Sequence, residues 1–239
     1  YGERDEIEFI DTFQGHADYY EGDEDTSEIL EGWLNESTHN VITAHYSGPD
    51  KVGHRWGIVG QEYKDKIRDI DVEITRILPL VPDGWTTIVT ADHGMTDVGS
   101  HGSAEDVTRD VSAFIFGPDI LPNTRFSGHQ RDVPALMSTV LGLPFPIQLH
   151  GRVPLEALDV SHENKIIIEQ WNWEAAYQRQ LFVNEENGIE STDLQLEVID
   201  WTKISEQETF TRDIDVAISI FNWAVLVTLC LIAIGVNIK

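Results

Sequence analysis

The feature that most constrains the fold is an apolar run that ends in two metal-binding side chains. Trp85–Thr90 is almost continuously apolar and β-branched, as expected for a strand buried on both faces of a parallel sheet. Asp92 and His93 follow it directly. In open α/β sheets, ligands bind at the carboxyl ends of the strands. The sequence therefore predicts a layered α/β domain that carries Asp92 and His93 at the ligand-binding edge of its sheet.

The flanking segments alternate between helical and strand patterns, which supports the α/β class. Apolar residues at helical spacing predict helices, short β-branched runs predict strands, and clustered glycines predict a loop. The predicted helices cover residues 25–34, 63–78 and 132–141, the strands 41–46, 85–90 and 111–116, and the loop 47–60.

The C-terminal third differs in character from the rest. Residues 159–214 are polar with helical spacing, which predicts a helical connector. Residues 216–236 are apolar except for Ser219, Asn222 and Thr228. About 20 apolar residues span a bilayer, so we predict a transmembrane helix there rather than a buried core helix. Lys239 follows this run and acidic residues precede it, which favours Lys239 in the cytoplasm and the preceding domain outside it, or in the lumen of the endoplasmic reticulum.

Charge and cysteine content exclude two classes of site. Forty-two acidic residues against 16 basic ones give a net charge of −26, which argues against binding nucleic acid through a basic surface. The single cysteine, Cys230, lies within the apolar run. A thiolate metal centre is therefore excluded, and any metal ligands must be histidines and carboxylates.

Two carboxylates and three imidazoles stand in glycine-containing segments, either in the predicted loop or after the strand that ends at Thr90. Each segment alone fits an ordinary turn or a capped loop, but together they suit two divalent ions, with zinc the first choice. Two ions about 4 Å apart clamp the attacking and leaving oxygens of a phosphoryl group. Each ion takes three or four protein ligands, so these five residues are at least one or two ligands too few for two ions. The candidate ligands are Asp50, His54, Asp92, His93 and His101.

These residues form patterns that resemble a known family. His45-x-x-Gly-x-Asp50-x-x-Gly-His54, Asp92-His-Gly-Met-Thr-Asp-x-Gly-Ser-His101-Gly, and a later segment from Asp132 to Pro146 are similar to the alkaline phosphatase superfamily. Within it, the chain most resembles the ethanolamine phosphate transferases of glycosylphosphatidylinositol (GPI) biosynthesis, from about His45 to Leu158.

The resemblance implies an alkaline-phosphatase-like central sheet flanked by helices. On this reading, residues 1–158 form the C-terminal part of a catalytic domain and residues 216–236 the first of several membrane spans. It implies that Asp50, His54 and His101 hold one zinc and that Asp92 and His93 hold the second. His45 is expected beside these ligands rather than on a metal.

The family completes the second site with an aspartate and a Ser or Thr nucleophile from the N-terminal part of the domain. No counterpart is evident here, so we expect a preceding segment or a separate polypeptide to complete the site. The resemblance implies a membrane-anchored phosphotransferase or phosphodiesterase that acts on a phospholipid or glycolipid through a covalent phospho-enzyme. The alternatives are a nucleotide pyrophosphatase-like phosphodiesterase and a non-catalytic fragment that lacks the nucleophile.

Overall fold

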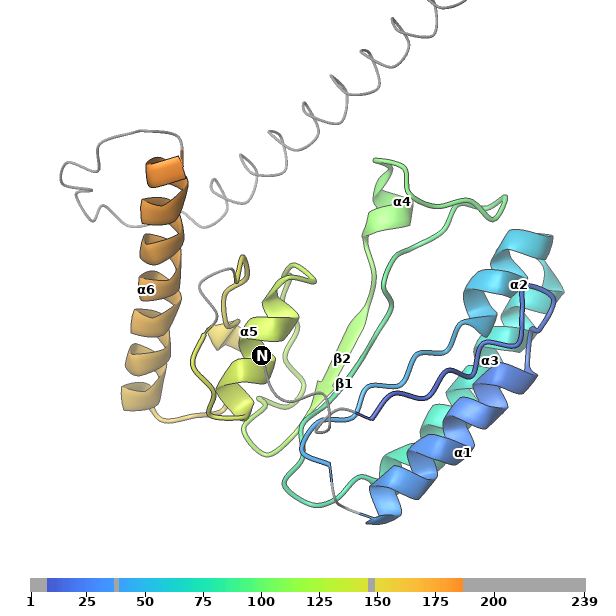
Figure 1. The fold of residues 1–239 in the computed structure, drawn as a ribbon, viewed down its shortest axis with the longest axis horizontal. Coiled ribbons are helices and arrows are strands. Elements are labelled where there is room, and N and C mark those ends of the chain that lie inside the picture. Colours follow the sequence, from blue (N-terminus) through green and yellow to red (C-terminus); the bar gives the residue numbers. More distant parts are fainter. Residues whose placement is uncertain (1–7, 37–38, 146–148, 187–239) are drawn as a thin grey trace, which may run out of the picture. The chain divides into compact units, whose positions relative to one another are not determined.

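A computed structural model describes residues 8–36, 39–145 and 149–186 (Figure 1). The contacts within the chain divide it into two units, Tyr1–Gln170 and Trp171–Lys239, and the first contains all five candidate ligands. The elements are α1 (Glu21–Glu36), α2 (Gly48–Trp56), α3 (Gln61–Ile77), the 3₁₀ turn η2 (Leu78–Leu80), β1 (Thr87–Thr90), α4 (Asp106–Arg109), β2 (Ala113–Phe116), α5 (Asp132–Val140), the 3₁₀ turn η3 (Leu155–Ala157) and α6 (His162–Glu186).

The first unit combines helices with a small sheet, which confirms the mixed α/β class. The helices α1, α3 and α5 form where apolar residues recur at helical spacing. Helix α3 packs against both α1 and α2, and the three form one helical layer (Figure 1).

The loop predicted over residues 47–60 is wrong, because Gly48–Trp56 forms the helix α2. Pro49 lies in the first turn, where its missing N–H costs no hydrogen bond, and Asp50 is an acid in the same turn. Gly57 ends the helix with a φ of 74°, a conformation that glycine adopts without strain. The glycines at 48 and 53 thus mark close packing rather than a loop.

The sheet also differs from the prediction. Strand β1 pairs with β2 in the antiparallel direction, from Thr87 opposite Phe116 to Thr90 opposite Ala113. These two strands make up the sheet in the described part of the chain, and the predicted strand at 41–46 is not a strand there. An apolar β-branched run favours extended backbone but says nothing about its partner. The parallel, fully buried arrangement predicted for β1 is therefore wrong.

The hydrophobic core of the first unit lies beneath this sheet. Ala135 and Leu136 of α5 pack with Val153 and Leu158, and all four are almost fully buried. Residues of both strands pack against the cluster, which fixes the strands relative to α5. The partly buried strand residues in question are Ile88 and Ile115.

Helix α6 forms the first part of the predicted polar connector. The rest of that connector and the predicted span at 216–236 lie outside the described residues. Among the residues that are described, no helix is both long and apolar enough to cross a membrane.

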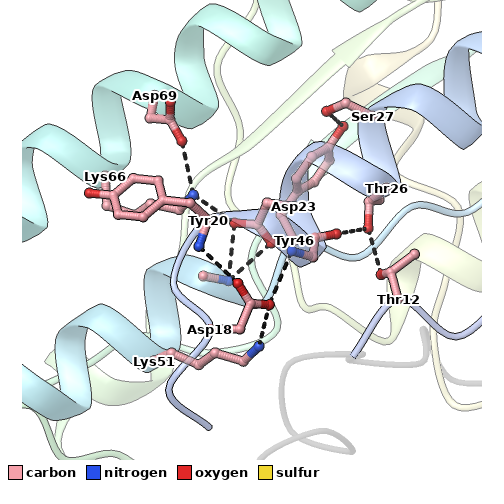
Figure 2. A network of polar contacts seen from close by, with 12 residues as sticks. Thr12, Asp18, Tyr20, Asp23, Thr26, Ser27, Tyr46, Lys51, Lys66 and Asp69 are labelled. Carbon is pink, nitrogen blue, oxygen red and sulfur yellow. Dashed lines mark hydrogen bonds and ion pairs between the residues drawn. The ribbon is translucent and has the colours of Figure 1, made fainter. Parts of the chain in front are cut away.

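A fully buried lysine joins α1 to α3. Lys66 of α3 lies 2.9 Å from Asp23 of α1 and 2.9 Å from Asp69, and its ammonium sits over the ring of Tyr20 (Figure 2). Burial alone would lower the pKa of Lys66, but hydrogen bonds to Asp69 and Asp23 hold it above its ordinary value. The lysine therefore remains charged and neutralises a buried aspartate.

Replacing Lys66 with alanine leaves the Asp23 carboxylate buried without its counterion. We expect a loss of about 3 kcal/mol in the free energy of unfolding, measured by urea denaturation followed by circular dichroism. Arg68→Ala on the same helix is the control, because it breaks a solvent-exposed pair with Asp65 and should cost less than about 1 kcal/mol. Equal losses in the two variants would contradict this account.

Candidate metal centre

Helix α2 presents two of the candidate ligands on one face. Asp50 and His54 are four residues apart, which is about one helical turn, so both side chains project in the same direction. The Oδ1 atom of Asp50 lies 3.5 Å from Nε2 of His54.

Asp92 and His93 follow β1, as predicted, and a neighbouring side chain holds their backbone. The amide of Gln130 donates hydrogen bonds to the carbonyl oxygens of Ala91 at 2.8 Å and Asp92 at 2.7 Å. The His93 N–H donates to Oδ1 of Asp92 at 3.0 Å. No feature of the sequence pointed to Gln130, because its role depends on a contact across almost forty positions of the chain.

Glycines allow α2 and the segment after β1 to approach at backbone distance. A Cβ atom on Gly53 would lie 2.3 Å from Sδ of Met95, and one on Gly99 would lie 2.1 Å from the carbonyl oxygen of Gly53. Gly99 also has a φ of 82°, which L-residues rarely adopt. Gly53 and Gly99, one from each motif, are therefore required by the contact between the two segments.

This approach gathers three imidazoles around one carboxylate oxygen. The Oδ1 atom of Asp50 lies 3.5 Å from Nε2 of His54, 3.5 Å from Nε2 of His101 and 3.9 Å from Nε2 of His93. This oxygen is buried and has no hydrogen-bond partner within the described part of the chain. The rings of His93 and His101 stack with centroids 3.9 Å apart.

The backbone sets the tautomers of two of these histidines. Nδ1 of His54 lies 2.7 Å from the carbonyl oxygen of Gly99, and Nδ1 of His93 lies 3.0 Å from that of Gly94. A carbonyl oxygen only accepts, so each Nδ1 carries a proton, and Nε2 is the ring nitrogen that faces Asp50 and is placed to bind a metal. Nε2 of His54 also lies 3.0 Å from Nε2 of His101, a contact that needs a shared proton or a cation.

The donor set suits a divalent metal ion. Asp50, His93 and His101 each offer one ligand atom, and these atoms all lie within 4.8 Å of one another. Nitrogen and carboxylate donors in a compact group match zinc. A buried carboxylate oxygen without a hydrogen-bond partner in the described region, surrounded by imidazole nitrogens, is the environment that a cation would stabilise.

The structure brings all five predicted ligands together but does not divide them into two separate groups. Nε2 of His93 lies 3.6 Å from Oδ2 of Asp92 and 3.9 Å from Oδ1 of Asp50, so it borders both carboxylates. The assignment of each residue to one of two ions therefore stays a prediction. His45 is exposed and makes no hydrogen bond or ion pair with the five ligands in the described region, so its expected place beside them also stays a prediction.

Tyr63 of α3 is a further group near the cluster that the sequence marked only as an apolar helix position. Burial raises its pKa, and the negative charge of Asp50 raises it further. The phenol therefore remains protonated beside the carboxylate.

The comparisons with known proteins cover the segment that carries this site. Residues 4–115, which include all five candidate ligands, match the family model described as type I phosphodiesterase / nucleotide pyrophosphatase. Over these residues the chain is similar to proteins of this description, which act on phosphoesters. No solved structure matches the chain.

More particularly, the chain is similar to GPI ethanolamine phosphate transferases, which confirms the predicted resemblance. It is 31% identical to GPI ethanolamine phosphate transferase 1 of Aspergillus fumigatus, over 53% of this chain and 15% of that protein. The same enzyme is 30% identical in Gibberella zeae, over 61% of this chain and 19% of the relative, and 31% identical in Mus musculus, over 50% and 16%. The chain thus spans less than a fifth of the length of these relatives.

Gly99→Ala tests whether the backbone approach sets the metal centre. The new Cβ would collide with the Gly53 carbonyl and push α2 away from His101, so we expect zinc affinity to fall by about tenfold, as measured by competition with a chromogenic chelator. Gly102→Ala is the matched control, because Gly102 has a φ of 80° but open space around it. Both variants carry the same backbone strain, so an equal fall in affinity would contradict the steric explanation.

Proposed function

We propose that this chain carries the metal-binding part of a two-metal phosphotransferase or phosphodiesterase. The observation that carries the proposal is the buried Oδ1 of Asp50, which lacks a hydrogen bond in the described region and faces the Nε2 atoms of three histidines. The family match across the same residues supports phosphoester chemistry at this site.

In this proposal Asp50, His54 and His101 bind one zinc ion, and Asp92 and His93 bind the second. Bound ions of this kind stabilise the charge of a phosphoryl group and lower the pKa of an attacking hydroxyl. The carbonyl oxygens of Gly99 and Gly94 hold His54 and His93 in the tautomer that ligation needs. Gln130 holds the backbone of Asp92. The remaining ligands of the second ion and the Ser or Thr nucleophile would come from a further segment.

The names of the relatives suggest the substrate. We propose transfer of phosphoethanolamine to a lipid-linked glycan, with a phospholipid or glycolipid substrate at a membrane. The apolar run at 216–236 would anchor the chain there, with the metal centre on the extracytoplasmic or lumenal side.

Metal content tests the site directly. We expect the purified chain to bind zinc, and Asp50→Asn and His93→Ala each to remove at least one equivalent, as measured by elemental analysis after dialysis. Asp97→Asn is the control, since Asp97 is an exposed acid in the same loop and should leave the stoichiometry unchanged. Unchanged zinc content in the Asp50 and His93 variants would refute the assignment.

A nucleotide pyrophosphatase-like hydrolase is the second candidate, because the matching family model carries that description. The two differ in the product formed in detergent by the zinc-loaded protein together with the segment that supplies the nucleophile. Phosphoethanolamine on a glycolipid acceptor, detected by mass spectrometry, would support the transferase. Rapid release of a nucleoside monophosphate from a nucleotide diester would support the hydrolase. Zinc binding without either product would identify a non-catalytic metal-binding chain.

A further inference from the structure

We propose that Asp23 is a positioning residue of the metal centre, which holds the N-terminus of α2 and thereby sets the place of Asp50 and His54. This inference rests on the proposed metal-binding function. Asp23 belongs to none of the sequence motifs and lies on α1, whereas the candidate ligands lie on α2 and in the loop after β1.

The Asp23 carboxylate caps α2 from another helix. Its two oxygens lie 3.1 and 3.2 Å from the Gly48 N–H, which donates to them at the start of α2 (Figure 2). Ser47 stands at the N-cap position and its carbonyl oxygen accepts from the Lys51 N–H, but its side chain makes no capping hydrogen bond. A negative charge at a helix N-terminus is favourable because the unpaired N–H groups there carry partial positive charge. Asp23 thus supplies the capping acceptor that the Ser47 side chain does not provide.

The packing at this end of α2 leaves no room for a side chain at Gly48. A Cβ atom on Gly48 would lie 2.2 Å from Oδ2 of Asp23 and 2.4 Å from Cε of Lys66. The backbone of α2 therefore lies directly against the buried pair. Gly48 is also the first position of the helix that carries Asp50.

Lys66 compensates the negative charge of the buried Asp23 carboxylate. Asp23 is 4% exposed and Lys66 is fully buried, so neither charge is solvated by water. The ion pair at 2.9 Å and the second pair to Asp69 offset the desolvation of both groups. One carboxylate thus joins α1, α2 and α3 at a single point.

A second, parallel contact acts one turn further along α2. Nζ of Lys51 lies 3.5 Å from Oδ2 of Asp18, and both side chains are largely buried. Burial alone would raise the pKa of Asp18, but N–H donors of Gly22 and Tyr20 and the charge of Lys51 hold it below its ordinary value. The two bridges fix both the position and the rotation of α2 about its axis, and the rotation decides where Asp50 and His54 point.

A helix of nine residues has little stability of its own, so its direction depends on such anchors. At its other end α2 is fixed by the contact between Gly53 and Gly99. If the anchor at Gly48 is lost, α2 can pivot about that contact and draw Asp50 away from His101 and His93.

Two double variants separate positioning from stability. In Asp23→Asn/Lys66→Met both charges are removed, but the asparagine oxygen still accepts from Gly48. In Asp23→Ala/Lys66→Met both charges are also removed, and the acceptor is lost as well. Neither variant leaves a buried charge, so they differ chiefly in the hydrogen bond to α2. Leu136→Ala, in the core beneath the sheet, is the control for a general loss of stability.

The first measurement is hydrogen exchange of the α2 amides in the metal-free chain at low temperature, and the second is zinc affinity. We expect the Asp23→Ala/Lys66→Met variant to lose protection in α2 and to bind zinc about tenfold more weakly than the wild type. The Asp23→Asn/Lys66→Met variant should keep its α2 amide protection and bind zinc within about twofold of the wild type. Loss of a hydrogen-bond partner that orients the ligands typically costs about tenfold or more in metal affinity. Leu136→Ala should be less stable but bind zinc with unchanged affinity.

Equal behaviour of the two double variants would overturn the positioning role, as would a fall in zinc affinity in Leu136→Ala that matches its loss of stability. The proposed function fails separately. If the wild type binds no zinc while α2 protection still depends on the Asp23 acceptor, the anchor on α2 is supported and the metal-binding function is refuted.

Discussion

The candidate metal centre depends on one steric constraint, the contact between the backbone of α2 and the loop after β1. At this contact the Gly53 carbonyl lies where any side chain on Gly99 would have to be placed. Because the two backbones meet there, His54 reaches the carbonyl of Gly99 with one ring nitrogen and His101 with the other. A bulkier residue would separate the carboxylate on α2 from the imidazoles on the loop. The glycines are thus as necessary to the site as the ligands are.

The charges of the helical layer serve the same arrangement. In a chain with 42 acidic and 16 basic residues, most lysines can pair with an acid at the surface. Lys51 and Lys66 differ because their side chains are buried, against Asp18 and Asp23 respectively. Such pairs contribute little net stability once desolvation is counted, but they are sensitive to geometry. In this chain the two ion pairs serve to orient α2. A short helix held by two charged contacts near its start and by a backbone contact near its end has little freedom to move its ligands.

The sequence predicted what local patterns determine. The helical spacing behind α1, α3 and α5, the position of β1 and the spacing of Asp50 and His54 all reflect interactions within a few residues. It failed where the decisive partner is distant in the chain. The antiparallel pairing of β1 with β2, the helix at Gly48–Trp56 and the roles of Asp23 and Gln130 each depend on a contact between separate segments. The clustered glycines predicted a loop, whereas Gly48 and Gly53 mark tight packing of a helix. The apolar run at 216–236 lies outside the described residues, so its membrane role remains a prediction.

The five candidate ligands are not equivalent in their surroundings, and this asymmetry bears on the proposed chemistry. The Oδ1 atom of Asp50 lies among three imidazoles, so candidate donors for one ion are already assembled from α2 and the loop after β1. Asp92 lies near His93 but is well exposed at its side chain. An ion that bound to Asp92 and His93 would therefore have open coordination positions on the solvent side. These open positions are where a nucleophile and a phosphoryl group would have to enter, because an ion with only two protein ligands needs further ligands to be held. The side of the cluster that carries Asp92 is thus the side on which the proposed reaction would occur, and the Asp50 side provides the preformed half of the centre.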